Sequence, residues 1–142
     1  MNDLLKVALS QYGQTEIKGE KDNPIIVNYF HDIGFNYIND DETPWCSCFV
    51  NWCALKAGYE RSKKLNARSW LEVGKKVMDP EIGDIVVYWR ESKDSWKGHV
   101  GIFIRRDNGM VYTLGGNQGS GSVNIKAYPE SKVLGYVRLN KL

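Results

Sequence analysis

The chain has 142 residues, of which 42% are hydrophobic, and its 19 basic and 17 acidic residues give a net charge of +2. This length allows one buried core and predicts a single catalytic domain over residues 1–142. Because acids and bases are interspersed without a basic stripe, nucleic acid is excluded as a partner. No stretch approaches 18 apolar residues, so no membrane span is predicted.

The first third of the sequence is typical of helices. Residues 3–12 form an amphipathic pattern that differs from a signal peptide, so synthesis in the cytoplasm is expected. Asn23 and Pro24 predict the start of a second helix over residues 24–33. His31 lies on the polar flank of that helix, where we expect a surface residue.

A third helix is predicted around Cys46. Thr43 suits its N-cap, Pro44 the first helical position and Cys46 the third, while Gly58 ends the helix. Apolar residues recur at helical spacing after Cys46, which places Cys46 on the buried face. Free backbone N–H groups and the helix dipole favour a thiolate there, and the same N–H groups could stabilise an oxyanion.

The chain contains three cysteines. An odd number argues against a complete disulfide framework, and the Cys-x-Cys-x4-Cys spacing matches no usual zinc signature, so neither a metal nor a cofactor is predicted. Cys48 lies about 200° around the helix from Cys46, and Cys53 lies two turns further along. Both are expected to be packing residues. Cys46 is either a nucleophile or a buried filler of the same kind.

A short helix over residues 66–74 is expected to precede a strand-rich second half. Antiparallel strands after helices predict an α+β fold, with a helical part over about 1–78 and a five- to six-stranded sheet over about 82–140. The predicted strands span residues 84–89, 99–105, 110–114, 122–128 and 134–139.

A cysteine nucleophile needs a base, and His99 is the better of the two histidines because it opens a core strand. Asn108-Gly109 predicts a hairpin turn between this strand and the next. The second strand therefore brings Asn117 or Gln118 back beside His99, where an amide oxygen could fix the imidazole tautomer. The shorter Asn117 is preferred, since it loses less freedom when held. Alternatively, both amides cap a Gly-rich turn.

Candidate substrate contacts surround this pair. Trp45 precedes the cysteine, and Trp96 lies in the polar loop of residues 90–97, which is long enough to border a groove. Packing in the core or a hairpin is the alternative for both tryptophans. Gln118 is a third candidate contact if Asn117 orients the histidine.

Four motifs in order carry a resemblance to a known family. They are Pro44-Trp45-Cys46-Ser47-Cys48-Phe49-Val50, Gly83-Asp84-Ile85-Val86-Val87, Gly98-His99-Val100-Gly101-Ile102 and Gly115-Gly116-Asn117-Gln118. Over residues 43–139 the chain resembles the CHAP and NlpC-type papain-like cysteine peptidases, which are bacterial cell-wall hydrolases. The resemblance implies a papain-like fold with Cys46 as nucleophile, His99 as base and Asn117 as orienting residue. It departs from the NlpC pattern at Trp45 and Cys48, where those enzymes usually have Asp and Gly.

The expected function is hydrolysis of an amide bond in peptidoglycan. An acyl transferase using the same triad and an idle module that binds wall peptides are the alternatives. The expected partners are peptidoglycan and either an immunity protein or a holin or secretion system, for a monomer that acts on the cell wall after release. The sequence does not identify the amide that is cleaved.

Overall fold

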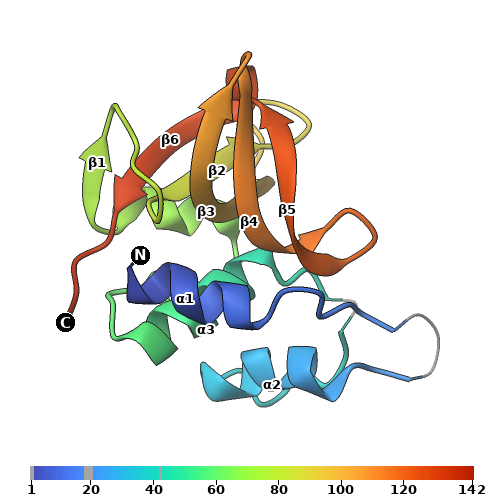
Figure 1. Ribbon diagram of the computed structural model, residues 1–142. Helices are drawn as coiled ribbons and strands as arrows, with labels where there is room; N and C mark the ends of the chain where they lie inside the picture. The colour runs from blue at the N-terminus through green and yellow to red at the C-terminus, as the bar shows by residue number, and fades with distance from the viewer. Residues whose placement is uncertain (1, 18–20, 42) are drawn as a thin grey trace.

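Helices pack against one side of an antiparallel sheet in the computed structural model, which describes residues 2–17, 21–41 and 43–142 (Figure 1). The predicted α+β class is confirmed. The helices are α1 (Asp3–Ser10), α2 (Pro24–Asp32), α3 (Cys46–Ala57) and the 3₁₀ helices η1 (Ala67–Glu72) and η2 (Glu130–Lys132). The strands are β1 (Lys75–Val77), β2 (Ile85–Trp89), β3 (Gly98–Asp107), β4 (Met110–Gln118), β5 (Ser122–Pro129) and β6 (Val133–Arg138), and the six-stranded sheet has the order β1-β6-β2-β3-β4-β5.

The helix ends follow local capping chemistry at α1 and α2. The Asn2 side chain accepts a hydrogen bond from the Leu5 amide at 2.8 Å, and Asn23 accepts one from the Ile25 amide at 2.9 Å. At the other end of the helical part, Gly58 ends α3 with a φ of 80°, as predicted.

The start of α3 differs from the prediction. Its N-cap is Trp45, which makes no side-chain cap hydrogen bond, so Cys46 is the first helical residue rather than the third. The predicted cap, Thr43, donates its backbone N–H and its hydroxyl to the Asp40 carboxylate at 2.7 and 3.0 Å. Thr43 is therefore held to Asp40 in the preceding loop, and the helix begins two residues later than predicted.

The predicted hairpin joins β3 and β4, whose pairing extends to Asp107 and Met110. Asn108 and Gly109 have φ values of 51° and 75°, as a turn matching the sheet twist requires. Strand β1 was not predicted, because its three residues Lys75–Val77 carry no alternating pattern. Its pairing with β6 means that the sheet begins near residue 75 rather than 82.

The sheet buries side chains on both faces. One face packs against the helices through Val87, Val100, Ile102 and Leu114. The opposite face holds a second apolar cluster of Val86, Tyr88, Phe103, Val111 and Tyr136. Helix α3 approaches β4 so closely that a Cβ on Gly116 would lie 2.6 Å from the Trp45 ring. The first turn of α3 is therefore fixed against the sheet.

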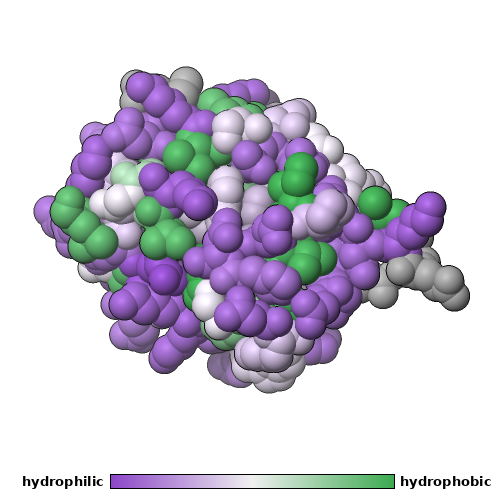
Figure 2. Space-filling view, turned by 90° about the horizontal axis from the view of Figure 1, so that it is seen from below, coloured by the Kyte–Doolittle hydropathy of each residue, from purple (hydrophilic) through white to green (hydrophobic). Residues whose placement is uncertain are grey.

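The face seen from below in Figure 2 is mostly hydrophilic, and its hydrophobic side chains lie in separate small patches. Among the described residues, no helix is both long and apolar enough to cross a membrane.

Candidate active site

Cys46 lies at the positive end of α3 and is 8% exposed. Burial raises the pKa of its thiol. A hydrogen bond from the Val100 amide, the positive charge of Arg90 and the N–H groups of Ser47 and Cys46 itself act in the opposite direction. The net rise is the reverse of the predicted thiolate, because desolvation at this position outweighs the backbone dipoles. The same N–H groups nevertheless point to where negative charge would develop.

His99 directly precedes Val100, the residue whose backbone amide hydrogen-bonds to Cys46. The imidazole is 1% exposed, with its ring centroid 5.1 Å from that of Tyr128 and 6.3 Å from that of Tyr88. The charge of Cys46 contributes to raising the pKa of Tyr128, so this tyrosine lies near Cys46 as well as near His99. The link through Val100 and Tyr128 is compatible with a Cys46–His99 pair, which stays a prediction.

The amide that meets His99 belongs to Gln118, whose Oε1 lies 2.8 Å from His99 Nε2. The orientation of this amide follows from its other partners. Gln118 Nε2 donates to the backbone oxygens of Thr113 and Asn124 at 3.1 and 2.8 Å, and both of these atoms can only accept. Gln118 Oε1 must therefore accept from His99, which places the imidazole proton on Nε2.

This tautomer leaves Nδ1 of His99 as a bare lone pair. Nδ1 is buried and has no hydrogen-bond partner among the described residues. Burial lowers the pKa of His99 to about 4, helped by the charges of Arg90 and Lys126, while the Gln118 hydrogen bond raises it. A neutral imidazole with a free Nδ1 next to a buried neutral thiol can act as a general base.

The sequence preference for Asn117 differs from this geometry. Asn117 has a φ of 57° and lies within an irregularity in the pairing between Gly115 and Gln118, which disrupts the simple alternation of side chains. Gln118 is thereby directed to His99 and is 1% exposed. A Cβ on Gly115 would lie 2.7 Å from Gln118 Oε1, so the glycine leaves the space that this amide oxygen needs.

A cavity of about 270 Å³ opens above Cys46. Arg90, Trp96 and Lys97 line one side of it, and Pro44 and Asn66 are among the residues on the others. Trp96 is 74% exposed and lies where a substrate could contact it. Trp45 is fully buried against Tyr29 and Phe49. This packing contradicts the prediction that Trp45 contacts the substrate.

One arginine holds the loop that carries Trp96. The Arg68 guanidinium, from η1, donates to the backbone oxygens of Ser92, Lys93 and Lys97 at 2.9, 2.7 and 2.9 Å. Three hydrogen bonds from one planar group fix the loop against the helical part of the chain.

A family model described as the CHAP domain matches residues 38–117, more than half of the chain and the segment that contains Cys46 and His99. The chain belongs to the CHAP domain family. Membership supports a function of the peptidoglycan-hydrolase type, as the sequence motifs implied.

A solved structure gives the same fold for this CHAP domain. It is described as similar to a lipoprotein of the NLP/P60 family from Staphylococcus aureus subsp. aureus Mu50, and has a TM-score of 0.54 and 15% sequence identity. The match covers 96% of this chain but only 40% of that protein. No curated protein matches the chain in sequence. The papain-like fold shared by the CHAP and NlpC/P60 families is thus confirmed.

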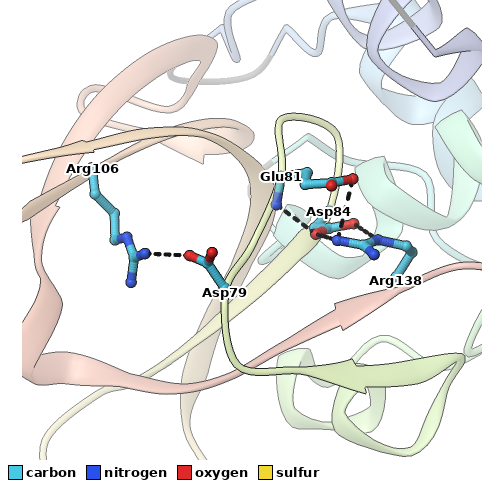
Figure 3. A network of polar contacts seen from close by, with 5 residues as sticks. All are labelled: Asp79, Glu81, Asp84, Arg106 and Arg138. Carbon is cyan, nitrogen blue, oxygen red and sulfur yellow. Dashed lines mark hydrogen bonds and ion pairs between the residues drawn. The ribbon is translucent and has the colours of Figure 1, made fainter.

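The Gly83-Asp84 motif of this CHAP domain lies outside the Cys46 cavity and stabilises the sheet (Figure 3). Asp84 is 4% exposed and accepts two hydrogen bonds from Arg138 on β6, at 2.9 and 2.8 Å. Glu81 also pairs with Arg138 at 3.4 Å, and Arg106 pairs with Asp79 at 2.7 Å. These contacts indicate that Asp84 has a structural role, which is to hold β6 through Arg138.

Three residues near the site were not identified from the sequence: Arg68, Arg90 and Tyr128. Arg68 lies on the short helix η1, Arg90 just after β2, and Tyr128 on β5, which is not the neighbouring strand of His99 in the sheet. The sequence predicts that the 90–97 loop borders a groove, and the basic residues of this loop could have indicated Arg90. Among the described residues, no group of three or more His, Cys, Asp or Glu side chains could hold a metal ion.

Proposed function

We propose that this CHAP domain is a cysteine hydrolase that cleaves an amide bond in the peptide part of peptidoglycan. Cys46 is the nucleophile, His99 the general base and Gln118 the residue that orients the base. The observation that carries the proposal is the tautomer of His99. Its Nε2–H is held by Gln118, so the bare Nδ1 is left on the ring that lies beside a buried thiol at a helix N-terminus.

The reaction begins from a neutral pair, since burial raises the pKa of Cys46 and lowers that of His99. As the Cys46 sulfur attacks the amide carbonyl carbon, the thiol proton moves to His99 Nδ1. The imidazolium that forms is stabilised by its Nε2–H hydrogen bond to Gln118. The carbonyl oxygen becomes an oxyanion, which the backbone N–H groups at the start of α3 can stabilise.

Collapse of the tetrahedral intermediate breaks the C–N bond, and His99 gives its proton to the leaving amine. Cys46 then holds the acyl group as a thioester. A water molecule, deprotonated by His99, attacks the thioester carbonyl, and the thiolate leaves and recovers the proton. The products are one new amine and one new carboxylate for each bond cleaved.

Purified protein added to isolated sacculi tests this proposal, with soluble products analysed by mass spectrometry. We expect fragments that gain one water for each cleaved amide, and none from Cys46→Ala. Retention on sacculi without products would support a binding module instead. Fragments joined to an added amine, in place of the water gain, would indicate an acyl transferase.

The mass of the fragments also identifies which amide is cleaved, which the fold does not determine. For the protein to reach this substrate, we infer that it acts outside the cytoplasmic membrane, after release through a holin, a secretion system or lysis.

A further inference from the structure

Arg90 is a basic residue that lines the Cys46 cavity. It is exposed and lines the cavity together with Cys46 and Trp96. Its guanidinium makes no hydrogen bond or ion pair with any described residue. By contrast, Lys97 on the same rim pairs with Glu91 at 2.7 Å.

The backbone of Arg90 is held even though its side chain is free. Its N–H donates to Lys97 O at 3.3 Å and its carbonyl accepts from the Ser92 amide at 2.8 Å. Arg68 fixes the same loop through three further backbone oxygens. The planar guanidinium can bind a planar anion through two parallel hydrogen bonds, and it loses less freedom per hydrogen bond than an ammonium group would.

The charge of Arg90 also reaches the reacting groups, since it lowers the pKa values of Cys46, His99 and Tyr128. Because Arg90 and Cys46 line the same cavity, an anion bound to Arg90 would lie close to the scissile carbonyl. The aromatic surface of Trp96 on the same rim would cover the apolar part of such a ligand.

We propose that Arg90 is the specificity residue of this site and binds a free carboxylate of the substrate peptide near the scissile amide. The proposal rests on the proposed function and names its substrate class: anionic stem peptides rather than their amidated forms. Peptidoglycan stem peptides carry several carboxylates, and conversion of one to a primary amide removes the charge while barely changing the shape.

The test uses a synthetic stem peptide and a set in which each carboxylate in turn is a primary amide. For the native protein, we expect one amidation to lower kcat/KM by about tenfold or more, mainly through KM. Arg90→Gln should cleave that amidated peptide and the unmodified one equally well. Arg105→Gln is the matched control, because Arg105 is also exposed but already pairs with Asp107, and it should keep the native preference.

Two results would overturn the inference. One is a native protein that cleaves every amidated peptide as fast as the unmodified one. The other is an Arg90→Gln protein that is slowed by the same factor on all peptides, since that would mean that Arg90 acts only on the thiol through its charge.

Failure of the proposed function gives a different pattern, in which the native protein cleaves neither sacculi nor peptides. Calorimetric binding of the same peptides to Cys46→Ala then decides the inference by itself. Tighter binding of the unmodified peptide than of one amidated form would support it. Equal binding of all forms would contradict it.

Discussion

The buried cluster of Cys46, His99 and Gln118 and the exposed rim of Arg90 and Trp96 are built in opposite ways. Each group of the cluster is at most 8% exposed, and its orientation is set by hydrogen bonds within the fold. The rim is attached mainly by the Arg68 guanidinium and presents its side chains to solvent. Under the proposed function, the core would position the reacting groups while a single loop would position the substrate.

This difference has a thermodynamic consequence. A change in the cluster alters a hydrogen-bond network in which each polar atom has few alternative partners, so it should lower turnover. A change on the rim alters contacts that are made only when substrate arrives, so it should raise KM and leave folding intact. The predictions below test that division from the largest expected effect to the smallest.

The largest effect is expected from Cys46→Ala, which removes the proposed nucleophile and should lower hydrolysis of sacculi on the order of 10⁴-fold. Cys48→Ala is the matched control, because Cys48 is fully buried in the same helix but lies about 200° around it from Cys46. It should keep most of the activity. Equal loss in both variants, with both folded by circular dichroism, would mean that the nucleophile is another residue.

The two tryptophans should separate stability from binding. Trp45→Ala removes a fully buried ring and should lower the free energy of unfolding by about 3–5 kcal/mol. Trp96→Ala changes a side chain that is 74% exposed. It should change the free energy of unfolding by less than about 0.5 kcal/mol while raising KM. Urea denaturation and kinetics on the same two proteins check this, and a stability loss at Trp96 as large as at Trp45 would contradict the division.

The pKa of His99 predicts a loss of stability in acid. Folding lowers this pKa from 6.5 to about 4, so between these values the unfolded chain binds a proton that the folded chain does not. The contribution of His99 is therefore complete above about pH 6.5 and is lost as the pH falls to 4, for a total of roughly 3 kcal/mol.

Urea denaturation across this range measures the effect, with His99→Gln as the reference protein. The reference should show a flatter dependence of stability on pH. Identical slopes for the two proteins would show that the imidazole is not shielded from solvent.

A smaller effect is expected from Arg68→Ala, which releases the loop at Ser92, Lys93 and Lys97. KM should rise by about five- to tenfold with kcat nearly unchanged, since the cluster does not depend on these bonds. Arg68→Lys should recover only part of the loss, because an ammonium group does not reproduce the planar fork. A fall in kcat with KM unchanged would connect the loop to the chemistry instead.

The sequence was most informative where local rules decide the structure. Periodicity and turn residues predicted α1, α2 and the β3–β4 hairpin, and the motifs around Cys46 and His99 led to the family. The start of α3 was placed two residues too early, because Thr43 is hydrogen-bonded to Asp40 in the preceding loop instead of capping the helix. Such a competition between nearby polar groups is not visible in a pattern.

The partner of His99 could be narrowed to two residues but not chosen correctly. Strand alternation favours either Asn117 or Gln118 depending on register, and the irregular pairing after Gly115 determines which one faces the histidine. Arg90 and Tyr128 were missed for a related reason. Their positions depend on a loop conformation and on the curvature of the sheet, which are set by contacts distant in sequence.

The most direct test of this account is a comparison of kcat for Gln118→Ala and Asn117→Ala on the same sacculi. Gln118→Ala removes the acceptor that holds the proton on His99 Nε2, so it should lower kcat on the order of 10²-fold with KM little changed. Asn117→Ala should stay within about threefold of the native protein. A large loss in Asn117→Ala with near-normal turnover in Gln118→Ala, both folded, would contradict the central claim that Gln118 prepares His99 as the base.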